Sequence, residues 1–289
     1  MTVSVIIPTL NAGEQITELL ETLSAQDLRP DEILVVDSQS DDDTVKRVSA
    51  FENVKLISIE RSTFNHGGTR DMAFKQAHGD YVLFLTQDAL PKNRSYIRNL
   101  LAPFSNPKVG MASGRQIARA DARPFEKLVR QFNYPDQSFT RSKADLPKLG
   151  IKTFFASDVC SAYRTTSYMA VGGFGKAVDT NEDMLIAAKM INSGYDIAYV
   201  ADAEVIHSHN LSFKQQYKRN YAVGKFMETH KTAFLGADKG LNNEGIQLVK
   251  YVMKNLLRER HYLSAYSFSL DCVARIAGNK AGVRSAKRL

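Results

Sequence analysis

Cysteine is scarce in this sequence, with only Cys160 and Cys272 among its 289 residues. The two are far apart and fit no C-x-x-C spacing, which argues against a cysteine metal site and predicts free thiols in a reducing compartment. The N-terminus lacks a basic region followed by a long apolar region, so we expect no secretory signal. No stretch reaches the roughly 20 apolar residues that a membrane span needs. Together these absences predict a cytoplasmic protein.

Two common nucleotide fingerprints are absent as well. The sequence contains no G-x-G-x-x-G after its first strand-like run and no G-x-x-x-x-G-K-[ST] loop. These absences count against dinucleotide-binding and P-loop proteins. A nucleotide would have to be bound by other chemistry.

Basic residues are concentrated near the C-terminus. From residue 211 onward there are 15 Lys or Arg against 5 Asp or Glu, whereas the first 210 residues have 23 against 26. This asymmetry predicts a tail that faces an anionic partner such as a membrane surface, and a solvated basic surface without a partner stays open. No nucleic-acid recognition motif accompanies the charge, and aromatic residues are not interleaved with it, so we expect no nucleic-acid partner.

Apolar runs alternate with helical patterns through the first part of the chain. The pattern between residues 14 and 26 places Ile16, Leu19, Leu20 and Leu23 at helical spacing, and residues 41–50 begin with an acidic first turn. Alternation of this kind predicts an α/β fold with a mainly parallel, doubly wound sheet. The strand-like runs are residues 3–7, 32–37, 54–59, 81–85 and 109–114.

Polar side chains follow four of these expected strands. Ligands of such sheets bind beyond the carboxyl ends of the strands, so Asp37, Arg70 and Asp88 are expected to share one crevice. Asp37 could accept a hydrogen bond from the imide N–H of a pyrimidine base. Backbone amides near Gly68, with the Arg70 guanidinium, could approach phosphate. Asp88 could hold a hard divalent ion against a diphosphate, or it could be an ordinary turn residue before a proline.

Five motifs taken in order resemble a known family. They are "VSVIIPTLNAG", "ILVVDSQSDDDT", "YVLFLTQDALP", "VGGFGKAVDTNEDMLIAAKM" and "AEVIHSHNLS". The set is similar to family 2 inverting glycosyltransferases with the GT-A fold, and "FNHGGTRD" resembles the bacterial rhamnosyltransferase branch. The resemblance implies a nucleotide-sugar donor, dTDP-L-rhamnose in that branch. It also implies Mg²⁺ or Mn²⁺ as cofactor and a hydroxyl acceptor, lipid-linked or saccharide, in cell-surface polysaccharide synthesis.

The resemblance also implies which residues form the donor and metal sites. The usual D-x-D metal motif is incomplete, because Thr86 occupies its first position and only Asp88 is acidic. Another ligand is then needed, and His207 and His209 are the candidates, although either could be a merely solvated residue at a strand end. The donor site implied in this way comprises Pro8, Thr9, Asn11, Asp37, Ser38, Gly68, Arg70, Gln87 and Asp88.

Inversion at the anomeric carbon requires a base that takes the proton of the acceptor hydroxyl. Glu182 and Asp183 stand at an expected helix start, where an acidic first turn also complements the helix dipole. In the family pattern the Asp of this pair is the base, so the resemblance assigns that role to Asp183, with Glu182 beside it to orient the acceptor. Asp158 is a further candidate for contact with either sugar.

The last third is less informative. Gln216 and Arg219, with Tyr221 in place of tryptophan, form a loosened Q-x-x-R-W motif, which implies acceptor or diphosphate binding. Residues 246–277 form an amphipathic helical pattern that could pack on the catalytic domain, form a homodimer, or lie on an anionic membrane as a peripheral anchor.

These patterns lead to a division of the chain by function. We expect a catalytic domain over residues 1–230, with a nucleotide-sugar half (1–115) and an acceptor half (116–230), and a basic helical region over 231–289. Two other functions stay open. One is a family 2 transferase that uses another nucleotide sugar, such as a UDP-linked hexose. The other is a non-catalytic nucleotide-sugar-binding protein, against which the presence of Asp183 argues.

Overall fold

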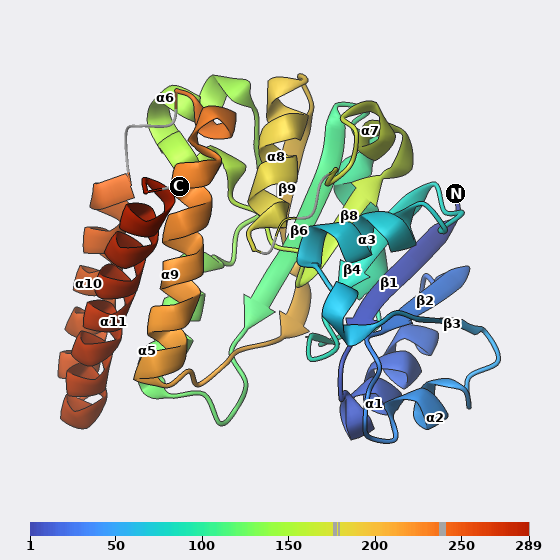
Figure 1. The fold of residues 1–289 in the computed structure, drawn as a ribbon, viewed down its shortest axis with the longest axis horizontal. Coiled ribbons are helices and arrows are strands. Elements are labelled where there is room, and N and C mark those ends of the chain that lie inside the picture. Colours follow the sequence, from blue (N-terminus) through green and yellow to red (C-terminus); the bar gives the residue numbers. More distant parts are fainter. Residues whose placement is uncertain (176–177, 179, 237–240, 289) are drawn as a thin grey trace. The chain divides into compact units, whose positions relative to one another are not determined.

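The computed structural model describes residues 1–175, 178, 180–236 and 241–288 (Figure 1). Lys176, Ala177 and Asp179, in one of the motifs above, lie outside the described residues, as do residues 237–240 of the expected C-terminal region. The chain forms two compact units, the first of residues 1–116, 136–144 and 154–207, the second of residues 117–135, 145–153 and 208–289. This division follows packing and is discontinuous in sequence. The division by function at residues 115 and 230 stays a prediction.

The first unit is built on a mixed sheet. Its strands are β1 (Val3–Thr9), β2 (Glu32–Asp37), β3 (Val54–Ser58), β4 (Tyr81–Leu85), β5 (Leu90–Pro91), β6 (Val109–Ile117), β7 (Phe139–Arg141), β8 (Cys160–Arg164) and β9 (Asp196–Ile206). They lie in the order β3-β2-β1-β4-β8-β6-β9-β5, with β7 paired to β9. All five predicted strands are present.

The sheet is mixed because some of its strands, β8 among them, run opposite to their neighbours. Strands β3, β2, β1 and β4 are parallel neighbours, and the register sets Thr9 opposite Asp37. Strand β8 lies antiparallel between β4 and β6, so all five predicted strands run in the same direction. The sequence pattern did not reveal β8 as an inserted antiparallel strand. The carboxyl ends of the predicted strands therefore meet at one edge, as a doubly wound sheet requires.

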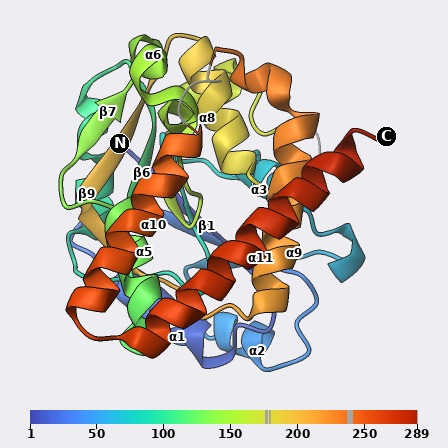
Figure 2. The same ribbon diagram turned by 90° about the vertical axis from the view of Figure 1, so that its left-hand side faces the viewer.

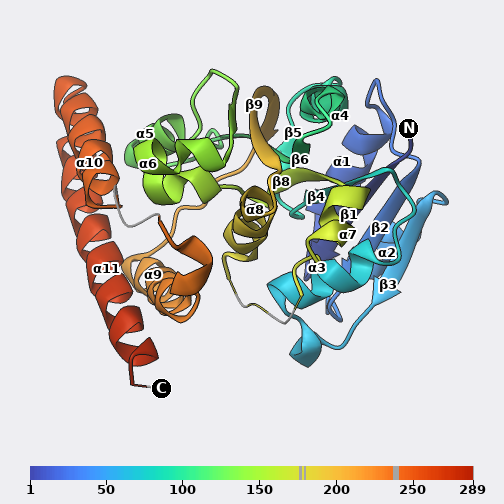
Figure 3. The same ribbon diagram turned by 90° about the horizontal axis from the view of Figure 1, so that it is seen from above.

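Helices cover both faces of the parallel part of the sheet (Figure 3). On one face, α1 (Gly13–Ser24) and α4 (Tyr96–Leu101) pack on Val5, Val35 and Leu83, with the predicted apolar side of α1 fully buried. On the other face, α3 (His66–Phe74) brings Phe74 against Phe84. The unit also contains α2 (Thr44–Val48), α7 (Thr165–Ala170) and α8 (Glu182–Asn192). The alternation of side chains along each strand thus supplies two apolar layers.

The second unit is helical. It contains α5 (Pro124–Asn133), α6 (Leu146–Leu149), α9 (Phe213–Thr229), α10 (Leu241–Arg258) and α11 (Tyr262–Ala286). Its apolar core joins Phe125 of α5 to Val252 of α10 and Phe268 of α11. Figure 2 shows α11 running across α9. Gly278 and Gly282 allow this approach, since a Cβ at either position would collide with the backbone carbonyl of Tyr217 or Tyr221.

The predicted helix over residues 246–277 is in fact two helices. Helix α10 ends at Arg258, and Arg260 has a left-handed backbone with φ of 61° before α11 begins. Apolar residues follow on both sides of this turn, and the sequence analysis treated them as one helix. None of the described helices is long and apolar enough to cross a membrane.

Candidate active site

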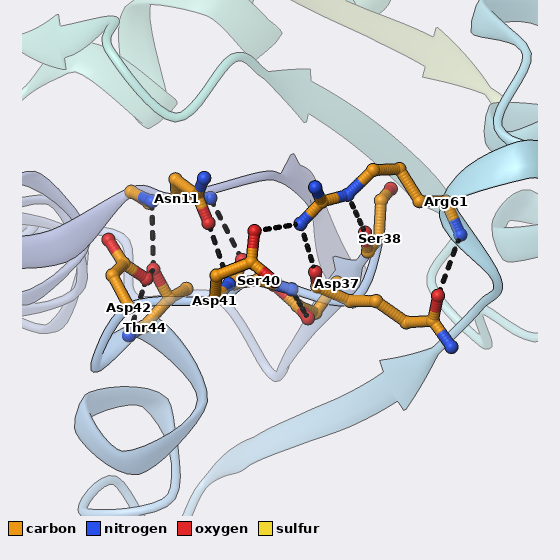
Figure 4. Close-up of polar contacts among 10 residues, drawn as sticks. Asn11, Asp37, Ser38, Ser40, Asp41, Asp42, Thr44 and Arg61 are labelled. Carbon is orange, nitrogen blue, oxygen red and sulfur yellow. Dashed lines mark hydrogen bonds and ion pairs between the residues drawn. The ribbon is translucent and has the colours of Figure 1, made fainter.

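The loops after β1 and β2 are tied together around Asp37 (Figure 4). The Asp37 side chain ends β2 and is almost completely buried, with 1% of its surface exposed. Thr9 Oγ1 donates to its Oδ1 at 3.1 Å, and the Ser40 amide donates to Oδ2 at 2.9 Å. The Ser40 hydroxyl also donates to Oδ1. Asp37 therefore organises the two loops. Its predicted contact with a nucleotide base stays a prediction.

Asn11 and Gln87 fix the first of these loops. Asn11 has a left-handed backbone, with φ of 51°, and its amide donates to Ser40 Oγ at 2.8 Å. Its side-chain oxygen accepts from the Asp41 amide at 2.8 Å. Gln87 bonds both backbone groups of Leu10, accepting at 2.8 Å and donating at 3.1 Å. Pro8 is part of β1. These contacts hold the loop in a strained conformation of the kind that clusters at ligand sites.

Ser38, unlike Asp37, has a side chain without internal hydrogen bonds among the described residues. Its side chain is 2% exposed, and its hydroxyl has no hydrogen-bond partner among the residues that the structure describes. Arg61 covers this loop, donating to Ser38 O at 3.5 Å and to Asp41 Oδ2 at 2.7 Å. The sequence prediction did not include Arg61, and its position just after β3 was the available signal. A contact between Ser38 and the donor stays a prediction.

Asp88 and His207 face each other where β4 and β9 end. Their atoms Oδ2 and Nε2 lie 3.5 Å apart. His207 Nδ1 is 3.0 Å from the amide oxygen of Gln116, whose nitrogen donates to Ser157 Oγ at 2.9 Å. The amide oxygen of Gln116 can accept a proton from Nδ1, which leaves Nε2 as the ring nitrogen on the side of Asp88. Gln116 was not predicted, although it is a polar residue near the end of a predicted strand.

This arrangement fits a divalent cation. Metal-binding histidines commonly donate the other ring N–H to an oxygen, as His207 does to Gln116. The hydroxyl of Thr86 is buried and has no partner within the described part of the chain, so one more oxygen is available near Asp88. His209 is exposed and belongs to the second unit, and its role as a ligand stays a prediction.

Arg70 lies inside the first unit and pairs with Glu182. The two side chains are 4% and 8% exposed, and Arg70 Nη1 donates to Glu182 Oε1 at 3.0 Å. At the start of α3, the Gly67 amide donates to Val178 O at 3.2 Å and the Gly68 amide to Asn65 Oδ1 at 3.0 Å. The Gly68 amide and Arg70 Nη1 thus have internal acceptors, whereas Arg70 Nε has no partner among the described residues. The contacts of Gly68 and Arg70 with phosphate stay a prediction.

The half-buried Asp183 and the buried Asp158 complete an acidic cluster beside this pair. Asp183 accepts from the Met184 amide at 2.8 Å and from the Asp158 amide at 3.4 Å. Asp158 Oδ1 accepts from Ser161 Oγ at 2.6 Å and from the Tyr163 hydroxyl at 2.7 Å. Asp158 Oδ2 is buried and has no partner among the described residues. Ser161 and Tyr163 alternate along β8, and this periodicity could have indicated a shared polar partner.

The surroundings make both carboxyls weak acids. Burial raises the pKa of Asp183 well above its ordinary value, and the charges of Glu182 and Asp158 add to this effect. Burial raises the pKa of Asp158 to about 6, against an opposing effect of Arg70. A carboxylate whose pKa is raised is a stronger base, as proton abstraction requires. The expected contact of Asp158 with a sugar stays a prediction.

The remaining predicted residues lie in the second unit. Gln216 is 2% exposed, and its amide oxygen, in the orientation that satisfies its neighbours, accepts from Arg275 at 2.6 Å. Arg275 in turn donates to Asp271 at 2.6 Å. Arg219 and His209 line a small cavity beside these residues. An acceptor role for Gln216 and Arg219 stays a prediction.

Known proteins are similar to this chain in sequence and in fold. The profile of Glycosyl transferase family 2 matches residues 4–172. The chain is 38% identical to the O-antigen chain rhamnosyltransferase RfbN of Salmonella typhimurium, over 98% of this chain and 90% of that protein. It is 37% identical to the O-antigen chain rhamnosyltransferase WbaN of Salmonella anatum, over 96% and 88%.

Two solved structures resemble the fold at low sequence identity. The mannosyltransferase PcManGT of Pyrobaculum calidifontis, in complex with GDP-Man and Mn²⁺, aligns with a TM-score of 0.62 at 18% identity, over 99% of this chain and 86% of that chain. Residues 1–349 of TarS from S. aureus align with a TM-score of 0.59 at 20% identity, over 100% and 92%.

Proposed function

Because this chain belongs to glycosyltransferase family 2, we propose that it moves L-rhamnose from dTDP-L-rhamnose to a hydroxyl group of a lipid-linked or saccharide acceptor. The fold is GT-A, as predicted. The choice of rhamnose and of cell-surface polysaccharide as the product is supported by similarity to the two O-antigen chain rhamnosyltransferases. Where this reaction takes place, at the inner face of a membrane with the enzyme as a peripheral protein, is a separate proposal that is argued from the C-terminal helices below.

The observation that carries the reaction is the acidic cluster in which the half-buried Asp183 lies beside the buried Asp158 and Glu182. In a direct displacement, the acceptor oxygen attacks the anomeric carbon from the face opposite the diphosphate. The acceptor O–H proton moves to an Asp183 oxygen, a new glycosidic bond forms, and the bond to the diphosphate oxygen breaks to release dTDP. Asp183 is held for this role by the Met184 and Asp158 amides. The anomeric configuration is inverted because only one displacement occurs.

Asp88 and His207 would hold Mg²⁺ or Mn²⁺ in this proposal. When bound, such an ion stabilises negative charge on a leaving diphosphate. The chain's own contribution is to aim the Nε2 lone pair of His207 at Asp88, which Gln116 does through Nδ1. A single protein carboxylate is sufficient, because Mg²⁺ is commonly held by one or two carboxylates together with phosphate oxygens.

The test is a donor panel on the full-length protein. dTDP-L-rhamnose, UDP-glucose and GDP-mannose are each incubated with the protein and Mn²⁺ without acceptor, and release of nucleoside diphosphate is measured. We expect slow hydrolysis of dTDP-L-rhamnose well above the other two donors, and loss of it in Asp183→Asn. Faster hydrolysis of UDP-glucose would show that the donor is a UDP-linked hexose and not dTDP-L-rhamnose. Binding of a donor without any hydrolysis would identify a non-catalytic binding protein.

A further inference from the structure

The last two helices, α10 and α11, which Figure 2 shows along the second unit, carry many exposed apolar side chains. In the described part of the chain, nine of the fifteen large hydrophobic side chains that are exposed lie beyond residue 245. A soluble surface usually scatters such side chains singly, and a gathered set marks an interaction site. The nine residues form what we term the C-terminal apolar face: Ile246, Val249, Leu257, Tyr262, Leu263, Tyr266, Leu270, Val273 and Ile276.

The spacing of these residues gives each helix an apolar side that is not used by the core. On α11, Leu263, Tyr266, Leu270 and Val273 recur every three or four residues and are 42–86% exposed. The buried side of the same helix uses Ala265, Phe268, Ala274 and the close-packed glycines instead. The exposed stripe is thus additional to what packing within the second unit requires.

Basic side chains border this face. On α10, Lys250 and Lys254 are exposed and adjoin the stripe of Ile246 and Val249. On α11, the exposed stripe continues beyond Val273 into Lys280 and Arg284. Residues 241–288 contain nine basic and three acidic residues in all, and one of the acids, Asp271, is paired internally with Arg275.

We propose that the C-terminal apolar face binds the surface of an anionic phospholipid bilayer. An interfacial helix combines an apolar side with Lys and Arg beside it, and tyrosines favour the boundary between lipid and water. Charge complementarity selects this occupant over a second copy of the chain, because two copies would bring like charges together on the same face. This proposal rests on the proposed function, which supplies the reason for membrane binding. A lipid-linked acceptor would be found at such a surface.

The test is sedimentation of the full-length protein with vesicles. One set contains phosphatidylglycerol and phosphatidylethanolamine, and the other contains only phosphatidylcholine. We expect binding to the anionic set that falls as salt rises, and little binding to the neutral set. Leu263→Glu should lower the partition coefficient on the order of tenfold, since it removes an apolar side chain and adds a repelled charge. The double variant Lys250→Gln, Lys254→Gln should weaken binding to anionic vesicles by a similar factor.

Leu235→Glu is the matched control, because Leu235 is 72% exposed in the same unit but lies outside α10 and α11. It should bind vesicles like the wild type. Equal sedimentation of Leu263→Glu and the wild type, or no binding of the wild type, overturns the proposal. A wild-type dimer that Leu263→Glu converts to a monomer assigns the face to a second copy and also overturns it.

The two proposals fail separately. Hydrolysis of dTDP-L-rhamnose needs no vesicles, and vesicle binding needs no turnover. We expect Leu263→Glu to hydrolyse the donor at the wild-type rate. Vesicle binding by a wild-type protein that hydrolyses no donor would leave the membrane proposal standing and remove the proposed function.

Discussion

Asp37 and Asp158 are both buried carboxylates of the first unit, but they differ in the number of hydrogen-bond donors and of charges around them. Asp37 receives donors at both oxygens from Thr9 and Ser40. Within the described residues, Asp158 has donors at one oxygen and none at the other, and the charge of Glu182 lies nearby. A carboxylate with donors at both oxygens can hold two loops together. A carboxylate that burial keeps partly unsatisfied has a raised pKa and exchanges protons near neutral pH.

The largest effect on activity should come from removing the proposed base, Asp183, from the cluster that it forms with Asp158 and Glu182. Asp183→Asn keeps the shape of the side chain but cannot accept the acceptor proton. We expect turnover to fall by roughly 10²-fold to 10⁴-fold, the usual contribution of general base catalysis. Affinity for dTDP, measured by calorimetry, should stay near that of the wild type. Turnover close to the wild-type rate would remove Asp183 from this role.

The metal site should show the next largest effect. Asp88→Ala should abolish the gain in dTDP affinity that Mn²⁺ produces, while binding of dTDP without metal persists. Gln116→Leu leaves both proposed ligands in place but removes the acceptor for His207 Nδ1, and should weaken Mn²⁺ binding by about 10-fold to 100-fold. Calorimetric titrations with and without Mn²⁺ measure both. If the metal effect is unchanged in Asp88→Ala, this assignment is falsified and Asp88 is a turn residue.

Asp37 should matter for stability. Asp37→Ala leaves the Ser40 amide and the Thr9 hydroxyl without their acceptor, which should lower the free energy of unfolding by about 1–3 kcal/mol. Asp41→Ala is the control in the same loop, because its carboxylate is 75% exposed and pairs with Arg61 at the surface. Its cost should be under about 1 kcal/mol. Equal unfolding midpoints in urea for the two variants would contradict this account of the loop.

Ser38 should give the smallest effect, and on binding instead of stability. Its hydroxyl has no partner to lose within the described residues, so Ser38→Ala should leave the unfolding midpoint unchanged or raised. Affinity for dTDP should fall by a few-fold, equivalent to about 0.5–1.5 kcal/mol for one hydrogen bond. A variant that binds dTDP like the wild type would show that this hydroxyl contacts no donor.

The sequence predicted individual helices and strands better than it predicted contacts between residues far apart in the chain. The five strands and the buried side of α1 follow from periodicities of two and 3.6 residues, which need no knowledge of the rest of the chain. The turn at Arg260 interrupts a periodic pattern without changing it. Packing of α5 against α10 and α11 joins segments more than one hundred residues apart, and local pattern carries no information about it.

The candidate site shows the same limit. The family resemblance named Asp88 and His207 as candidate metal ligands, and these two side chains lie 3.5 Å apart although β4 and β9 are not neighbours in the sheet. The crevice that the sheet topology predicted for Asp37, Arg70 and Asp88 stays a prediction. Hydrogen bonds that decide chemistry were not predictable, because they join residues far apart in sequence. Arg70 meets Glu182, 112 positions away, and Gln116 lies 91 positions from His207. Such partners determine which polar groups are already satisfied, and hence which can act on a ligand.

The most direct test of this account is the pH dependence of kcat/KM for rhamnosyl transfer at saturating Mn²⁺, in the wild type and in Asp158→Asn. The base works when deprotonated, so kcat/KM should rise with pH through the pKa of the cluster, well above the ordinary Asp value of about 4. Removing the Asp158 charge, which raises the pKa of Asp183, should move this rise to lower pH. A rise near pH 4 in the wild type, or one at the same pH in both proteins, would contradict the claim that the acidic cluster supplies the base.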